Sequence, residues 1–575
     1  NTFYRGASPS VVETEITNPL EEQLATLASV KTITSSSIEQ GSVITVEFEL
    51  ERDVDEAANE VRDKVSRIRG QLPTEAEDPI VSKVDANAQP IIWLALTSQQ
   101  HSLLELSDVA DRLLKERLQR VPGVGAVFIG AERRYAMRVW LDPSRLAAHQ
   151  LTPQDIAQAI AVENVEVPGG LVEGTQREFT VRTRGELNTA EEFANIIVAR
   201  TQQGEVRLSD VAEVALGAED ERTAARYNGQ PAIGLGIVKQ SKASTLDVGR
   251  DVRAALPELA SILPGGMTMD VAYDSSTFIQ ESVNEVAQTI LIAIFLVILV
   301  VLAFLKSPRA TLIPVVAIPI SIVGAFVFAY FLGYTINILT LLALVLAIGI
   351  VVDDAIVMLE NIVRHLEMGK GRLRASYDGA KEIGFAIVAT TIALVAVFIP
   401  VSFLTGTVGR LFREFGIMVA VSVAISGFVA LTLSPMLCSK ILRPIHGGGG
   451  WAGRSFDRFF DWVDRTYTRI LTGSMHHRAI TLGVALVLVV SAVGVYRIMP
   501  RELVPVEDRG IAFGIVLAPE GSTLEYTDSY MRRIEEILLP LPERRALFTA
   551  TGLGFGGPGR VTNAFIFLNL KDRSE

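Results

Sequence analysis

The sequence predicts an α+β membrane protein, in which a polytopic bundle of transmembrane helices is joined to soluble regions built from small sheets and helices. Two observations carry this prediction. In the middle of the 575-residue chain, long windows without Asp, Glu, Lys or Arg alternate with short polar loops. On either side of that middle part, strand-like and helix-like patterns follow one another without a regular βα alternation, which is typical of α+β domains.

The apolar windows are long enough to cross a membrane. A helix needs about 20 apolar residues to span ~30 Å of hydrocarbon. Six transmembrane helices are therefore expected, at 286–305, 310–332, 336–359, 383–404, 415–438 and 479–496. Basic residues gather after the first, third and fifth of these spans, and such residues collect on the cytoplasmic side. Both soluble regions are therefore expected outside the cytoplasm.

Two adjacent carboxylates, Asp353 and Asp354, interrupt the third span. Each costs roughly 2.5 to 3.5 kcal/mol at the centre of a membrane helix on insertion scales, so a compensating use is expected. Neighbouring residues on a helix point about 100° apart, so one carboxylate can face a partner helix while the other reaches water. Protonation would then release a cationic partner and shift the helices between two arrangements. A proton relay is the prediction, and a static buried ion pair is the alternative.

The soluble regions contain a repeated order of elements, of split βαβ type. A helix is expected at 8–27, strands at 30–38 and 43–50, a helix at 53–68 and a closing strand at 91–97. A second unit is expected to follow, with a helix at 103–118, strands at 125–129 and 135–141, a helix at 152–162, and later strands at 178–184, 196–199 and 267–273.

The end of the chain repeats its beginning. Strands at 510–518, 547–551 and 562–570, a helix at 523–539 and a glycine-rich turn at 552–559 follow the order seen from 8 to 53. Such internal repeats are typical of transporters built from two halves. A chain that starts inside one repeat and stops inside the next is expected to be a fragment.

Composition narrows the function classes. The net charge is −12 and the soluble regions are acidic, which disfavours nucleic acid as a partner. The single cysteine, Cys438, excludes a disulfide framework within the chain and a cysteine-based metal cluster, and is expected to be a packing residue. No Walker A loop occurs, so neither ATP nor another cofactor is expected. Four histidines are expected in solvated cytoplasmic loops rather than at a metal site: His365, His446, His476 and His477.

Three motifs together resemble permeases of the resistance-nodulation-division superfamily, in the hydrophobe/amphiphile (AcrB-like multidrug) branch. They are Gly349-Ile-Val-Val-Asp-Asp-Ala-Ile-Val357 with Glu360-Asn361, Arg309-Ala-Thr-Leu-Ile-Pro314, and Asn228-Gly-Gln-Pro231. The resemblance covers essentially the whole chain. It implies a secondary transporter rather than an enzyme, which exports hydrophobic or amphiphilic compounds in exchange for protons driven by the proton-motive force. It places the cationic partner of the aspartates in a part of the family's fold outside this chain.

The resemblance also implies location, partners and domains. The protein is expected in the bacterial inner membrane as a homotrimer, in contact with membrane lipid, a periplasmic membrane-fusion adaptor and an outer-membrane channel. Ferredoxin-like porter subdomains are expected in the periplasm. The expected domains are a first porter and docking region (1–280), five spans (281–445), a cytoplasmic linker with an amphipathic interfacial helix (446–478), a sixth span (479–498) and a truncated second porter region (499–575).

Family members bind drugs in a periplasmic pocket rich in phenylalanine. Phe548, Phe555 and Phe567 match pocket aromatics, whereas Leu553 replaces one. On the other wall, Pro90 and Ile91 stand where an aromatic is expected, so that wall is expected to be aliphatic. For each phenylalanine, ordinary core packing is the alternative. The segment 168–184 matches a hairpin that reaches into the neighbouring subunit.

Two alternatives to multidrug export remain open. One is a heavy-metal efflux permease of the same superfamily, which the Asp-Asp pair and the lack of a methionine cluster in the soluble regions disfavour. The other is a membrane sensor of sterol or lipid that transports nothing, and such a protein would need no titratable pair.

Overall fold

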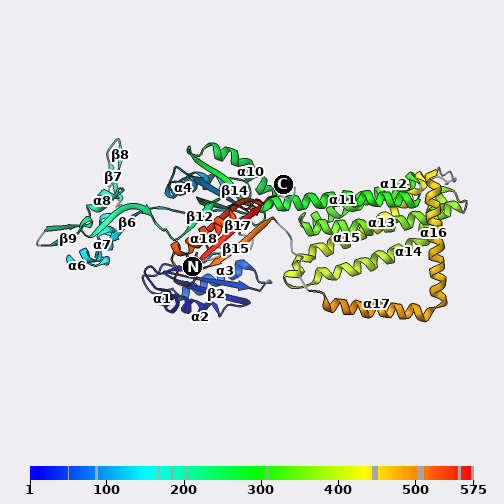
Figure 1. Ribbon diagram of the computed structural model, residues 1–575, viewed down its shortest axis with the longest axis horizontal. Coiled ribbons are helices and arrows are strands. Elements are labelled where there is room, and N and C mark those ends of the chain that lie inside the picture. Colours follow the sequence, from blue (N-terminus) through cyan, green and yellow to red (C-terminus); the bar gives the residue numbers. More distant parts are fainter. Residues whose placement is uncertain are drawn as a thin grey trace. The chain divides into compact units, whose positions relative to one another are not determined.

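The computed structural model describes residues 1–49, 51–83, 89–165, 168–182, 185–201, 204–305, 307–442, 451–500, 510–554 and 559–571. The chain divides into two compact units. The sheet unit comprises residues 1–280 and 509–575, and the helical unit comprises residues 281–508. Figure 1 shows the elements of each unit.

The sheet unit begins with a small α+β layer. Strands β1 (Thr2–Phe3), β2 (Val30–Ile38) and β3 (Gly41–Phe48) form an antiparallel sheet in the order β1-β3-β2. One helical stretch precedes β2, made of α1 (Pro9–Val12), the π-helical η1 (Glu13–Thr17) and α2 (Asn18–Leu24). Helix α3 (Val54–Ile68) follows β3, and the Asp53 side chain caps it by accepting the N–H groups of Asp55 and Glu56. The core of this layer is formed by apolar residues of the helical stretch and of α3: Val12, Ile16, Leu20, Leu24, Val65 and Ile68.

The last part of the chain repeats this order, as predicted. Strand β15 (Ile511–Leu517) is followed by α18 (Leu524–Leu538), β16 (Arg544–Thr551) and β17 (Asn563–Leu570). The three strands pair antiparallel in the order β15-β17-β16, which is the order β1-β3-β2 again. In both copies the helical segment connects the first and second strands of the set. Apolar residues at every second position of β17 explain why α18 packs on this set of strands. Ala564, Ile566 and Leu568 point to the same face and pack with Met531 of α18.

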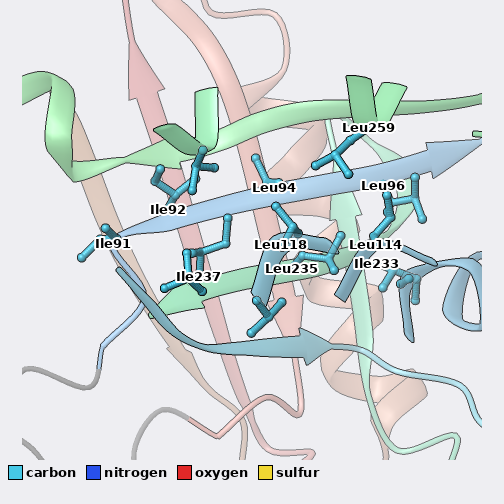
Figure 2. Packing of buried hydrophobic residues seen from close by; sticks show 14 of the residues in the cluster. Ile91, Ile92, Leu94, Leu96, Leu114, Leu118, Ile233, Leu235, Ile237 and Leu259 are labelled. Atoms are coloured by element: carbon cyan, nitrogen blue, oxygen red, sulfur yellow. The ribbon is translucent and has the colours of Figure 1, made fainter. Parts of the chain in front are cut away.

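A second sheet segment is assembled from distant parts of the chain. β4 (Ile92–Ser98), β5 (Val124–Gly130), β13 (Gln230–Lys239) and β14 (Met267–Asp274) pair antiparallel in the order β14-β4-β13-β5. α4 (Leu103–Val109), η3 (Ala110–Lys115) and α5 (Glu116–Gln119) connect β4 to β5, and α10 (Thr245–Ser261) connects β13 to β14. Figure 2 shows Leu94 and Leu96 of β4 and Leu235 of β13 beside Leu114 and Leu118 of the first connection.

The sheet continues through β12 (Ala224–Tyr227) to the carboxyl-terminal strands. Its order is β14-β4-β13-β12-β16-β17-β15, with β5 also paired to β13. The predicted assignment of 91–97 to the first α+β unit is therefore wrong. β4 has the alternation of a strand, but its partners lie much further along the sequence, and periodicity carries no information about them.

Between β5 and β12 the chain forms a separate group of elements. β6 (Tyr135–Leu141) pairs with β11 (Ala212–Ala218), β9 (Ile197–Thr201) with β10 (Gly204–Arg207), and β7 (Pro168–Glu173) with β8 (Glu178–Arg182). Its helices are α6 (Pro143–Ala148), α7 (Pro153–Glu163), α8 (Ala190–Ala194) and α9 (Leu208–Val211). β5 and β6 thus belong to different sheets, and the prediction that they form one unit is wrong.

Among the described residues of the helical unit, six helices are long and apolar enough to cross a membrane, which confirms the predicted number. They are α11 (Ser275–Leu305), α12 (Pro308–Phe331), α13 (Ile338–Glu367), α14 (Arg372–Phe398, continued by the 3₁₀ turn η4, Ile399–Phe403), α15 (Gly406–Ile441) and α17 (Arg478–Ile498). A further helix, α16 (Trp451–His476), covers the predicted amphipathic segment. Cys438 is buried among apolar residues, as predicted.

Helices α12, α13, α14 and α15 pack side by side (Figure 1), with α13 in contact with the other three. Small residues bring the helices close, as is usual in membrane bundles. A Cβ on Gly379 of α14 would lie 3.0 Å from Ile362 of α13. One on Gly324 of α12 would lie 3.1 Å from Ile425 of α15. The first of these close approaches involves α13, the helix that carries the two aspartates, and the second joins two helices that pack against it.

Candidate functional site

The aspartate pair lies near the middle of α13, one face of which is buried against neighbouring helices. Asn337 caps the start of this helix, since its side chain accepts the N–H of Thr340 while the Thr340 hydroxyl accepts the N–H of Asn337. Further along, Val351, Val352 and Ala355 are buried. Asp353 is exposed on the surface of the helical unit, whereas Asp354 is only 9% exposed. The two carboxylates therefore face different surroundings, as their 100° separation predicts.

Two neighbouring helices enclose this part of α13. Ala355 packs with Ala317 of α12 and Val429 of α15. The Ser426 hydroxyl of α15 donates a hydrogen bond of 2.8 Å to the Val351 carbonyl. Yet Oδ2 of Asp354 is buried without a hydrogen-bond partner among the residues that the structure describes. An ionised carboxylate is costly in such surroundings, and either a proton or a cation reduces that cost.

Two of the aromatic residues predicted to line a substrate pocket, Phe548 and Phe567, lie opposite each other on one face of the eight-stranded sheet. Phe548 of β16 is 4% exposed and packs in a cluster with Ala95, Ala272 and Ala550. Phe567 of β17 and Leu553 pack against that cluster while half-buried, and the rings of Phe548 and Phe567 lie 6.3 Å apart. The structure therefore brings three of the four predicted residues together. Phe555 lies outside the described residues.

Other aromatic rings extend this group beyond the predicted residues. The rings of Trp93 on β4 and Phe548 are stacked at 6.2 Å, and those of Phe513 on β15 and Phe567 lie 4.9 Å apart. Gly234 and Gly236 on β13 make room for Trp93, because a Cβ at Gly236 would lie 2.9 Å from its ring. The aliphatic wall expected near residues 90 and 91 stays a prediction, and the indole of Trp93 adds an aromatic surface nearby. Alternation along β4 indicates which face of the sheet carries Trp93, but not that Phe548 is its neighbour.

The comparison with known families decides the class of protein. A family model described as the AcrB/AcrD/AcrF family matches residues 1–575, which is the whole chain. The chain belongs to this family. It is therefore a permease of the resistance-nodulation-division type, a transporter rather than an enzyme. Its six apolar helices agree with a permease inserted in a membrane.

In this permease the predicted place of one histidine is wrong. His365 lies within α13 and is 7% exposed, whereas a solvated loop was expected. Its Nε2 lies 2.6 Å from Glu382 of α14, and its Nδ1 lies 2.9 Å from the Lys370 ammonium. Lys370 also pairs with Asp378 at 2.7 Å. Because an ammonium can only donate, Nδ1 accepts, so Nε2 carries the proton and donates to Glu382. His476 and His477 are exposed, and His446 lies outside the described residues.

Asp354 and His365 belong to one buried stripe of α13. Asp354, Met358, Asn361 and His365 follow one another at intervals of four, three and four residues, which places them on one face of the helix. All four are buried. The Asn361 amide donates to the Gly379 carbonyl of α14 at 2.9 Å. These intervals can be read from the sequence. The stripe was not predicted because the span was expected to end at residue 359, whereas α13 continues to Glu367.

The sheet unit of the permease contains a buried ionic network that sequence reasoning missed. Nε of Arg226 on β12 donates to both carboxylate oxygens of Glu535 on α18, at 2.9 and 2.8 Å. Its Nη1 donates to Asp528, and the Thr549 hydroxyl also donates to Glu535. Burial alone would lower the pKa of the Arg226 guanidinium, but the hydrogen bonds and charges of Glu535 and Asp528 outweigh burial and raise this pKa. Arg226 therefore stays charged and joins two distant parts of the chain.

Proposed function

We propose that this permease exports hydrophobic and amphiphilic compounds from the inner membrane of a double-membraned bacterium, in exchange for protons that enter along the proton-motive force. The observation that carries the proposal is the buried Asp354, whose Oδ2 lacks a hydrogen-bond partner among the described residues. A proton reduces the cost of such a group, and its loss restores that cost. Asp353 directly precedes Asp354 and is exposed, which supports exchange of the proton with water or with a group on another helix.

Coupling requires an element with two arrangements that protonation biases. α13 has a suitable position, because it packs against α12, α14 and α15 through small residues and the Ser426 to Val351 hydrogen bond. A change of charge at Asp354 alters the balance of forces between α13 and these helices. In the proposed mechanism the resulting shift of the helices drives the sheet unit between shapes that admit and release substrate.

The substrate class is proposed from the aromatic face of the sheet unit. Flat apolar molecules are bound by ring stacking and by burial of apolar area. Phe567, Leu553 and Trp93 are half-buried and so present part of their surface, whereas Phe548 supports them from within the cluster. We include Phe555 in this proposed pocket by resemblance alone. The buried stripe of α13 and this aromatic face then have separate tasks, proton coupling and substrate binding.

The sheet unit is proposed to lie in the periplasm and to form ferredoxin-like porter subdomains. The order β14-β4-β13-β5, with helices connecting β4 to β5 and β13 to β14, supports that type of fold. The proposed boundaries are porter and docking elements in 1–280, five spans in 281–445, a linker with the interfacial helix α16 in 446–478, a span in 479–498 and a second porter region in 499–575.

A homotrimer that works with an adaptor and an outer-membrane channel is proposed from the family. The β7-β8 hairpin supports the trimer, because Leu171, Val172 and Phe179 are 59%, 57% and 60% exposed. Apolar side chains gathered at such a hairpin suit burial against a neighbouring subunit. Amine-reactive cross-linking of the protein in a membrane preparation should give covalent trimers, and a purely monomeric product would contradict this assembly.

Drug susceptibility of a pump-deleted host tests the proposed activity. Asp353→Asn and Asp354→Asn should each abolish export of dyes and detergents while leaving the amount of membrane protein unchanged, because an amide cannot exchange protons. Glu360→Gln is the matched control, since Glu360 is an exposed carboxylate on the same helix. Retention of most of the transport by both Asp variants would reject the coupling. Export of heavy-metal salts alone would favour the metal-efflux alternative.

A further inference from the structure

One end of the helical unit contains an open cavity with a strongly basic lining. Its volume is about 610 Å³, within the range of ordinary small-molecule sites. The lining comes from the beginning of α14 and the end of α15: Gly371, Arg372, Leu373, Arg374, Ser439 and Lys440. Three of these side chains are cationic and none is acidic. The cavity therefore suits an anion.

The nearby carboxylates leave this positive charge largely uncompensated. Asp378 lies 2.7 Å from Lys370 but 4.0 Å from Arg374, so its charge is shared with another cation. Toward residues that the structure describes, the Arg372 side chain donates only a long hydrogen bond of 3.4 Å, to the Leu442 carbonyl. Within the described part of the chain, no carboxylate lies within ion-pair distance of Lys440. Arg374 has an 83% exposed side chain and is free to turn toward a ligand.

The backbone at the same place also favours an anion. Helix α14 has 27 residues and begins at Arg372. Its N-cap, Gly371, offers no side-chain hydrogen bond, and the first intrahelical bond is donated by Ala375 to Gly371. The N–H groups of Arg372, Leu373 and Arg374 therefore have no partner within the helix, and these three residues line the cavity. The positive end of the helix dipole adds to the charge of the side chains.

The surroundings of the cavity indicate an amphiphilic anion. α14 and α15 both qualify as membrane spans by length and composition, so we expect their joint end near a membrane surface. Exposed apolar side chains continue from the cavity along the spans, with Leu373 at 78%, Tyr377 at 68% and Phe385 at 84% exposure on α14 and Met436 at 47% on α15. Acyl chains would cover this surface, whereas a free phosphate ion would leave it uncovered.

We propose that this cavity is a binding site for the phosphate group of an anionic phospholipid. The phosphate lies between Arg372, Arg374 and Lys440 and accepts hydrogen bonds from the first turn of α14, and the acyl chains lie along the exposed face of α14. Basic clusters between the ends of transmembrane helices bind such headgroups on the cytoplasmic side of membranes, where the positive-inside rule places this loop. The inference is independent of proton coupling and of the exported substrate.

Association of spin-labelled lipids with the purified protein tests the proposal. Labelled phosphatidylglycerol should be immobilised by the wild-type protein in preference to labelled phosphatidylcholine. Lys440→Gln and Arg374→Gln should each weaken that preference about five-fold, as expected for one basic residue at an anionic surface. Arg478→Gln is the control, because Arg478 is an exposed basic residue at the start of α17 and does not line the cavity, and it should leave the preference unchanged.

Two results would overturn the assignment. An equal effect of Arg478→Gln and Lys440→Gln would mean that general surface charge attracts the lipid, without a built site. Displacement of labelled phosphatidylglycerol by millimolar inorganic phosphate would assign the cavity to a free anion instead of a lipid. Arg374→Gln serves as the second variant if Lys440→Gln is poorly folded, because its 83% exposed side chain contributes little to packing.

Discussion

Arg226 and Glu535 form a buried ion pair between positions 309 residues apart in the sequence, in which Nε of the arginine lies 2.8 Å from one carboxylate oxygen. The side chains are 10% and 5% exposed. The pair joins β12, which belongs to the first part of the sheet unit, to the helix that covers the last part. A second carboxylate, Asp528, completes the arrangement and also pairs with Arg532 at 3.0 Å.

Removal of the arginine should destabilise the sheet unit strongly. Arg226→Met leaves Glu535 buried without its cation, whereas Asp528 keeps its pair with Arg532. Loss of one partner of a buried ion pair typically costs about 3 to 5 kcal/mol. Urea unfolding of the purified protein, followed by tryptophan fluorescence, measures this loss. The control is Arg222→Met, because the pair of Arg222 with Glu39 is more than half exposed and exposed pairs contribute ~0 to 1 kcal/mol. Equal losses in the two variants would show that the buried network is unimportant.

A nearby turn offers a second test of how the two parts of the sheet unit are joined. Asn228 and Gly229 connect β12 to β13 with φ of 50° and 81°, as a two-residue hairpin turn requires. The Asn228 side-chain oxygen also accepts from Arg544 at 2.7 Å and from the Leu547 N–H at 3.0 Å. Asn228→Gly keeps the turn but removes both bonds, so it should cost about 1 to 3 kcal/mol in the same unfolding assay. An unchanged midpoint would contradict a joining role for this side chain.

In the helical unit, the close contact of α13 with α14 should tolerate no added methyl group. A Cβ at Gly379 would lie 3.0 Å from Ile362 and 3.1 Å from its Cα, so Gly379→Ala forces the helices apart at a cost of about 1 to 3 kcal/mol. Gly384→Ala is the control on the same helix, because its Cβ would meet Leu431 at an ordinary 3.7 Å. Thermal unfolding in detergent should separate the two, and a lower midpoint for Gly384→Ala than for Gly379→Ala would contradict the packing account.

The aromatic face predicts different outcomes for two phenylalanines. Phe548 is buried, so Phe548→Ala should lower protein abundance and depress export of every compound, since truncation of a buried Phe costs about 3 to 5 kcal/mol. Phe567 is half-buried, so Phe567→Ala should weaken export of aromatic compounds by roughly 1 kcal/mol or more and that of aliphatic detergents less. Resistance profiles normalised to protein level distinguish these effects. A uniform loss for Phe567→Ala that follows abundance would remove this residue from the pocket.

The helices and strands could be predicted from the sequence far better than which of them lie next to each other in the fold. The alternation of Ile92, Leu94 and Leu96 identifies β4 as a strand, because the period of two reports which side chains face the core. It could not show that β4 lies between β13 and β14, since partners are set by packing between distant segments. The repeat at the two ends of the chain was predictable because each copy is local, with its helix and strands following one another directly.

The candidate site also combines residues that local sequence reveals with residues that only the fold reveals. Asp353 and Asp354 could be identified from the sequence because a carboxylate in an apolar span costs free energy whatever the positions of the neighbouring helices. His365 and Arg226 were missed, because a polar residue near the end of a span or in a strand is usually solvated and only the fold shows that these two are buried. Trp93 was missed for a related reason, since its contact with Phe548 depends on how β13 and β12 connect β4 to β16.

Proton movement in reconstituted vesicles shows directly whether Asp354 couples proton flux to substrate export. The transporter is placed in liposomes that contain a pH-sensitive dye, a proton gradient is imposed, and an amphiphilic substrate is added. Substrate should accelerate proton flux through the wild-type protein and through Glu360→Gln. Asp354→Asn should abolish this substrate-dependent flux although the protein still binds substrate, and flux of wild-type size through Asp354→Asn would rule out proton coupling at this residue.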